Sequence, residues 1–298
     1  MTTPAAHRPR AAHRPRTARL LTHALVAALA LAVAVPVGWV LLASLKQKSE
    51  FFGSPWTLPK SAHLRNYTDA FLGAHMGRYF LTSALVTLLG LALVLAVSVP
   101  AAYVVARYEF RGRRLIELAL MAGLFVNVNY IVVPIFLMLV DWDRALIDVF
   151  PGGFFIDNPA ILSLVYAATS IPFTVYLLTA FFRSIPVEYE EAAALDGASR
   201  LRIMTRIMLP MARPAVTTVI LFDFLAYWND FIISLTLLPG DDKTLQVGLL
   251  NLFTAQKAAA DYGRLYAGMV IVIVPVLVVY ALIQRRLIEG IASGGVKG

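Results

Sequence analysis

The chain has 298 residues, of which 59% are hydrophobic and 15% are charged, and its mean hydropathy is +0.72. A soluble domain carries roughly a quarter charged residues, so this composition excludes a soluble protein and indicates an integral membrane protein. The net charge of +8 is spread over successive polar segments, which is typical of membrane orientation and not of nucleic-acid binding. The lack of cysteine excludes disulfides, thiolate metal sites and a cysteine nucleophile.

Six apolar stretches, each long enough to cross the hydrocarbon core, predict the fold. They run roughly over residues 20–45, 80–106, 115–140, 160–182, 214–238 and 265–284. The expected fold class is therefore an all-α integral membrane protein with about six transmembrane helices. The first stretch follows a basic arm, but it is too long for the apolar core of a signal peptide, so we expect a retained span.

Lysine and arginine are distributed unequally between alternating polar segments. With the N-terminus inside, 17 of the 26 lie in inner segments and nine in outer ones. Because positive residues stay on the cytoplasmic side, both termini are expected in the cytoplasm. The expected division is a basic cytoplasmic arm at 1–19, a membrane domain at 20–284 with a cytoplasmic loop at 183–213, and a cytoplasmic tail at 285–298.

The polar island at residues 183–213 begins with a predicted short helix. Pro186 suits a first helical turn, and the acidic residues after it favour the positive end of the helix dipole: Glu188, Glu190 and Glu191. Alanines and a leucine continue the helix. Gly197 is expected to end it with a positive φ.

A second short helix is expected to begin at Ser199, its N-cap, and to end at Pro210. One face would carry Leu201, Met204 and Met208, and another face Arg202 and Arg206. Such a pair of helices at the membrane surface could anchor the loop in lipid or form a docking site for another protein. The pattern alone leaves both interpretations open.

The spacing within this island resembles a family signature. Glu-Ala-Ala, three residues, Gly, nine residues, Ile, one residue and Leu-Pro is the signature loop of permease subunits of ATP-binding-cassette (ABC) importers. The chain fills every position of it with Glu191, Ala192, Ala193, Gly197, Ile207, Leu209 and Pro210. Other segments resemble the carbohydrate-uptake branch, more closely its maltose-transporter-G-like permeases: NYTDAF at 66–71, ARYEFRGRR at 106–114, FFRSIPVEYEEAAALDGAS at 181–199, YWNDF at 227–231 and QRRLIEGIASGGVKG at 284–298.

Two features depart from that family pattern. Thr82-Ser83 stands where the family usually has Asn-Ser, and a minor packing change is expected. Residues 141–159 are longer and more aromatic than the family leads us to expect. That segment is therefore a candidate for specificity toward a substrate or a binding protein.

The resemblance implies a transport subunit that works with partners in a bacterial cytoplasmic membrane. These are a second permease subunit, an ABC ATPase dimer and an extracytoplasmic sugar-binding protein. The chain has no GxxxxGK[ST] phosphate loop, so ATP and Mg²⁺ would be used by the partner ATPase. The loop would sit in a cleft of that ATPase, with Glu191 paired to a basic residue, and no cofactor or metal is expected on this chain. Its five histidines show no metal-ligand spacing.

Polar residues inside the expected spans are candidates for the sugar path, because such residues are costly in lipid and usually face the bundle interior. The third span supplies Asn127, Asn129 and Tyr130, and the fifth supplies Tyr227, Trp228, Asn229 and Asp230. Hydrogen bonding between helices, or packing of a gate, is the competing interpretation for each. Asp223 and Asp230 share one helix face, and Asp223 is expected to be held by a partner helix.

Two other function classes predict sequence features that this chain lacks. A secondary active transporter of a small polar solute would be expected to show internal repeats, but the glycine-turn loop occurs once. An intramembrane enzyme would need a catalytic group such as HExxH, which is absent. The sequence does not name the sugar; an oligosaccharide or disaccharide is the family expectation, with amino sugars such as chitobiose as one candidate.

Overall fold

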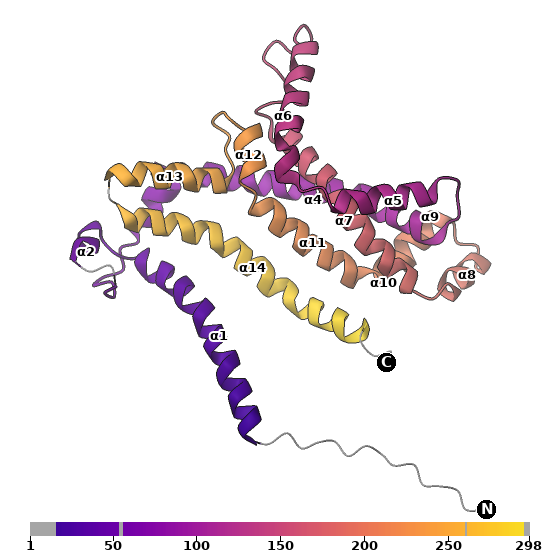
Figure 1. The fold of residues 1–298 in the computed structure, drawn as a ribbon, viewed down its shortest axis with the longest axis horizontal. Coiled ribbons are helices and arrows are strands. Elements are labelled where there is room, and N and C mark those ends of the chain that lie inside the picture. Colours follow the sequence, from indigo (N-terminus) through magenta and orange to yellow (C-terminus); the bar gives the residue numbers. More distant parts are fainter. Residues whose placement is uncertain (1–15, 54–55, 260, 295–298) are drawn as a thin grey trace, which may run out of the picture.

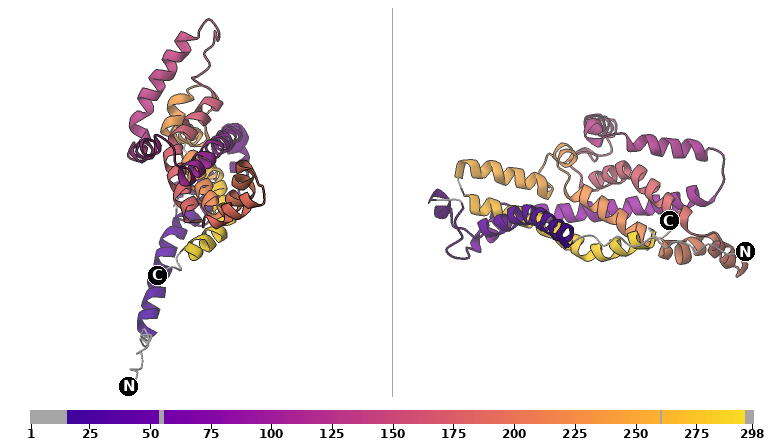
Figure 2. Two further views of the ribbon diagram at one scale, coloured as in Figure 1. Left: turned by 90° about the vertical axis from the view of Figure 1, so that its right-hand side faces the viewer. Right: turned by 60° about the horizontal axis from the view of Figure 1, so that its bottom comes forward.

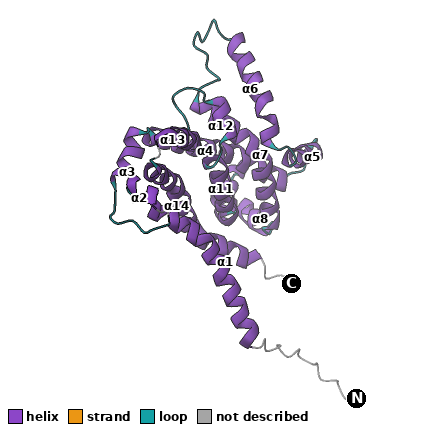
Figure 3. Cartoon of the chain, turned by 60° about the vertical axis from the view of Figure 1, so that its left-hand side comes forward, coloured by secondary structure: helices purple, strands orange, loops and turns teal. Residues whose placement is uncertain are grey.

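The computed structural model describes residues 16–53, 56–259 and 261–294, and every regular element within them is helical (Figures 1 and 3). Residues 1–15 of the expected arm and 295–298 of the expected tail lie outside this range, whereas 16–19 belong to α1 and 285–294 to α14. In chain order the elements are α1 (Arg16–Ala43), α2 (Lys48–Gly53), α3 (Arg65–Thr68), η1 (Asp69–Gly73), α4 (Met76–Arg107), α5 (Arg113–Leu124), α6 (Val128–Ala145), α7 (Pro159–Ser184), α8 (Glu188–Leu195), α9 (Arg200–Ile203), η2 (Met204–Met208), α10 (Leu209–Met211), α11 (Arg213–Trp228), α12 (Ile232–Leu237), α13 (Leu245–Ala259) and α14 (Tyr262–Gly294).

Four described helices are each long and apolar enough to cross a membrane, namely α1, α4, α7 and α14. Two bent pairs meet the same criterion jointly, one formed by α5 and α6 and the other by the segment Arg200–Met211 and α11. The described residues therefore hold up to six spans. The expected all-α membrane fold is confirmed, and the first, second, fourth and sixth apolar stretches each correspond to one long helix.

The third expected span is not the single helix predicted over 115–140. The chain bends by 105° between α5 and α6, and α6 projects from the body (Figures 1 and 2). The Asn127 side chain accepts a hydrogen bond from the Asn129 N–H at 3.0 Å and so caps α6. This local bond competes with helix continuation, which is why an apolar run contains a break.

The fifth expected span, 214–238, is also interrupted. Helix α11 ends at Trp228, and α12 begins at Ile232. Asp230 accepts the Ser234 N–H at 2.9 Å and acts as a cap for the second segment. Helix α13 has no counterpart among the predicted elements and occupies part of the expected outer loop after residue 238.

The buried side chains form two apolar cores along the long axis. One core, toward the α13 end, includes Tyr166, Trp228 and Leu245. The other, toward the α8 end, joins α4 and α7 to the short helices through Tyr103, Phe182 and Met208. Helices α4 and α7 pack against each other and contribute to both cores.

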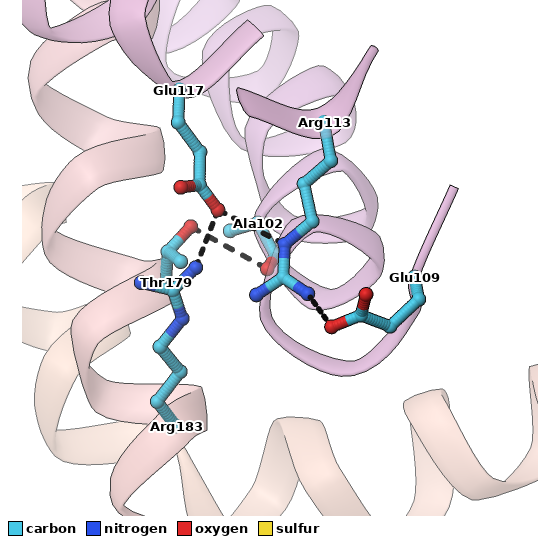
Figure 4. A network of polar contacts seen from close by, with 6 residues as sticks. All are labelled: Ala102, Glu109, Arg113, Glu117, Thr179 and Arg183. Carbon is cyan, nitrogen blue, oxygen red and sulfur yellow. Dashed lines mark hydrogen bonds and ion pairs between the residues drawn. The ribbon is translucent and has the colours of Figure 1, made fainter. Parts of the chain in front are cut away.

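Helix α5 is fixed to α7 by charged side chains. The Glu117 carboxylate accepts hydrogen bonds from Arg113 Nε at 3.0 Å and from Arg183 Nη2 at 2.5 Å (Figure 4). Arg113 also pairs with the exposed Glu109 at 2.9 Å, and the Thr179 hydroxyl donates to the Ala102 carbonyl. The α5–α7–α4 layer is therefore held by polar contacts as well as by packing.

Candidate functional site: the helix–glycine–helix loop and the helix breaks

The first half of the loop folds as its sequence predicts. Helix α8 carries three glutamates in its first turn and ends at Leu195. Gly197 has φ +78°, and its N–H donates to the Ala194 carbonyl at 3.0 Å. A Cβ built at Gly197 would meet no atom within 4 Å, so the backbone conformation alone creates the requirement for glycine here.

The second half departs from a regular helix. Ser199 caps it as predicted, accepting from the Arg202 N–H at 3.4 Å. A π-turn, η2, occupies the five residues before α10, and the helical run continues through Pro210 to Met211. Proline has no N–H to donate to the preceding turn, and a π-turn is a common way for a helix to absorb such a mismatch.

The π-turn changes which side chains face inward. Met208 and Ile203 are buried, whereas Leu201 is 66% exposed. The predicted face of Leu201, Met204 and Met208 is uneven in burial: Leu201 and Met204 line one pocket beside α4, and Met208 is fully buried.

The signature residues divide between an outward and an inward side. Glu191, Ala192 and Gly197 are exposed. Ala193 is buried, and Ile207, Leu209 and Pro210 are partly buried, with Ala193, Ile207 and Leu209 in the same core as α4 and α7. The loop is thus packed onto the helices on one side and open on the other.

The path candidates lie at the two helix breaks. Asn127, Asn129 and Tyr130 are exposed at the α5–α6 bend, and Asn229 is exposed just after α11. Helix α12 packs against α6, so the two breaks lie in neighbouring parts of the bundle (Figure 1).

The remaining candidates are engaged within the chain. Trp228 is buried and donates from Nε1 to the Val272 carbonyl at 3.1 Å. Tyr227 stacks on Tyr166 with a 5.0 Å separation of ring centroids. Asp230 accepts a hydrogen bond from the Tyr166 hydroxyl at 2.7 Å in addition to capping α12.

The expectation for Asp223 is confirmed. It is buried, and Thr174 of α7 donates to its carboxylate at 3.0 Å. Ser83, which follows the departing Thr82 and itself matches the family pattern, accepts the Leu245 N–H at 2.7 Å and so helps to start α13. Both contacts join segments that lie far apart in the sequence.

The aromatic segment at 141–159 is folded by hydrogen bonds. Asp143 accepts backbone N–H groups from three consecutive residues, Phe154, Phe155 and Ile156. Asp157, at φ +59°, accepts the Gly240 N–H at 2.9 Å. The segment is therefore tied to the loop after α12, and its role in specificity stays a prediction.

Sequence reasoning missed the contact of Glu190, which it placed only in the first turn of the loop helix, with Tyr103 and Arg107 on α4. In the sequence, Arg107 and Tyr103 lie 83 and 87 residues before Glu190, so no local pattern could reveal these contacts. The only available signal was an arginine at the end of a long apolar run.

Comparison with known proteins is consistent with this geometry. Residues 95–292 match the family "Binding-protein-dependent transport system inner membrane component". The diacetylchitobiose uptake system permease protein NgcG of Streptomyces coelicolor is 39% identical, over 92% of this chain and 87% of that protein. The trehalose transport system permease protein SugB of Mycobacterium tuberculosis is 31% identical, over 89% and 92%.

The fold is also that of a solved transporter subunit. A chain from the crystal structure of a bacterial ABC transporter involved in alginate import superposes with a TM-score of 0.75 at 22% identity, covering 92% of this chain and 99% of that one. The matches favour the importer interpretation over a secondary transporter. The chain belongs to the binding-protein-dependent inner-membrane components and is a permease subunit of an ABC sugar importer.

Proposed function

We propose that the chain forms one half of a sugar-translocation pathway and that residues 191–210 couple it to a partner ATPase. The partners are a second permease subunit, an ABC ATPase dimer and an extracytoplasmic sugar-binding protein. ATP and Mg²⁺ act on the ATPase, because this sequence has no phosphate-binding loop. Both termini lie in the cytoplasm, on the side that carries most of the positive charge.

The two-sided packing of the loop carries the coupling proposal. Its inner side chains share a core with α4 and α7, so displacement of the loop disturbs both helices. On its outer side Glu191 is exposed beside Ala192, a small residue that permits close approach. Leu195, 89% exposed, and Leu201 add apolar contact area of the kind found in protein interfaces.

The proposed sugar path follows the exposed polar side chains at the two helix breaks, Asn127, Asn129, Tyr130 and Asn229. Irregular backbone at membrane depth is tolerated only where it is buried in protein or lines a water-filled cavity. Tyr227 and Trp228 support this surface from inside the bundle, and Asp230 orders the start of α12.

For the substrate, we propose a disaccharide of N-acetylated amino sugars. The support is the 39% identity to a relative named for diacetylchitobiose uptake, compared with 31% to one named for trehalose. Uptake of radiolabelled diacetylchitobiose by cells expressing the complete transporter tests this. Competition by unlabelled diacetylchitobiose but not by trehalose is expected, and the reverse preference would reject the assignment.

The coupling role is tested by reversing one charge. Glu191→Lys should leave membrane insertion intact, abolish sugar uptake and weaken copurification of the ATPase. Glu188→Lys is the matched control, since Glu188 is exposed on the same helix but lies outside the signature. Normal uptake by a well-expressed Glu191→Lys protein would reject the docking role and favour lipid anchoring.

A further inference from the structure

An enclosed ion pair joins the docking loop to the end of α4. Arg107 Nε lies 2.5 Å from Glu190 Oε1, and the Tyr103 hydroxyl donates to Glu190 Oε2 at 2.7 Å. Arg107 also donates from Nη2 to the Ile185 carbonyl at 2.6 Å, where α7 ends. One guanidinium therefore contacts both the first turn of α8 and the turn that precedes it.

The pair is the most enclosed among the ion pairs between described residues. The Arg107 and Glu190 side chains are 12% and 14% exposed. By contrast, the Glu109 partner of Arg113 is 95% exposed. Removing one member of an enclosed pair leaves a desolvated charge behind, whereas an exposed pair contributes little.

Consecutive glutamates on α8 face in different directions. Glu190 points into the contact with α4, whereas Glu191 is exposed. Adjacent helical residues project about 100° apart, so a single turn can hold the scaffold with one carboxylate and present the other. Force applied on the Glu191 side thus passes through a short helix that is fixed to α4.

Helix α4 also reaches the break after α11. A Cβ built at Gly90 would lie 3.1 Å from the Tyr227 ring, so the two helices touch closely there. Tyr227 lies one residue before Trp228, where α11 ends. One continuous helix therefore contacts the docking loop at its end and the proposed path near its middle.

We propose that Tyr103, Arg107 and Glu190 are positioning residues that lock α8 to α4, so that movement of the docked ATPase enters the membrane domain through α4. This rests on the proposed docking of residues 191–210. Glu191 receives the partner, and Glu190 transmits the displacement. Without the lock, the ATPase binds and hydrolyses ATP while α4 follows incompletely.

The test uses the complete transporter in proteoliposomes with its binding protein and measures sugar transported per ATP hydrolysed. Glu190→Gln and Arg107→Gln should lower this ratio at least about fivefold, with ATPase copurification unchanged. Glu188→Gln on the same helix and Glu109→Gln in the exposed pair are matched controls that should keep the native ratio. A purely structural role would lower complex yield and leave the ratio intact.

Tyr103→Phe tests the same contact in a variant that keeps the packing of the ring. It removes only the hydroxyl that donates to Glu190. It should lower the same ratio by a smaller factor at native yield. Exchanging the charges in Arg107→Glu with Glu190→Arg should recover part of the ratio lost in either single change. A native ratio in Glu190→Gln, Arg107→Gln and Tyr103→Phe would overturn the inference. If the ratio is native while Glu191→Lys abolishes docking, only the inference fails; if Glu191→Lys docks normally, the proposed function fails.

Discussion

Gly197→Val should weaken docking of the ATPase through backbone strain alone. Gly197 has φ +78°, and a Cβ there would meet no atom within 4 Å, so no steric clash contributes. Holding an L-residue in the left-handed region costs roughly 1–2 kcal/mol, which lowers the equilibrium constant for forming the native turn about 5- to 30-fold. The apparent affinity for the ATPase should fall by up to this factor, because it is reduced by the fraction of molecules that hold the binding-competent turn.

A titration of detergent-solubilised permease complex with purified ATPase measures this factor. Gly197→Asn should bind nearly as well as the native protein, because asparagine tolerates positive φ. Gly112, at φ +90° and equally free of neighbours, supplies the matched control outside the loop. Gly112→Val should leave ATPase affinity unchanged. Native affinity in Gly197→Val, or an equal loss in Gly112→Val, would refute the reasoning.

The other predictions concern topology, partners and buried carboxylates. In this cysteine-free chain, Ser61→Cys should react with an impermeant maleimide from outside and Ser199→Cys only after permeabilisation; outside labelling at 199 would reverse the topology. The chain reconstituted alone should neither hydrolyse ATP nor transport diacetylchitobiose, and flux without partners would revive the secondary-transporter interpretation. Asp223→Leu should lower complex yield, since it leaves the buried Thr174 hydroxyl without its acceptor at a cost of about 1–3 kcal/mol. Asp230→Asn should reduce yield less than Asp230→Ala, because one oxygen remains for the helix cap; equal yields would argue against that role.

Hydropathy predicted the long helices because an apolar run of sufficient length has few alternatives in a bilayer. It could not predict the breaks, because Asn127 and Asp230 start new helices through side-chain hydrogen bonds to the backbone. Such a bond is compatible with either a continuous or an interrupted span until the neighbouring helices are placed.

The loop shows the same division between local and long-range information. Gly197 and Ser199 act through local backbone geometry, so their roles could be predicted from position in the sequence. The exposure of Leu201 could not, since it depends on how the second half of the loop packs against the rest of the bundle. The Arg107–Glu190 contact was also hidden, because it forms only when α4 and α7 bring distant segments together.

The isolation of α1 has a consequence for the order of biogenesis. Its apolar segment from Leu20 to Ala43 is almost wholly uncovered, and it packs mainly against α14. Lys46, just beyond α1, is buried against the Trp39 ring, close to where α14 begins at Tyr262. The ribosome makes that helix more than 200 residues after α1. Within this chain, the first span can therefore form its main helix–helix contact only after the last span has been synthesised, so the earliest part of the chain to enter the membrane is among the last to be packed.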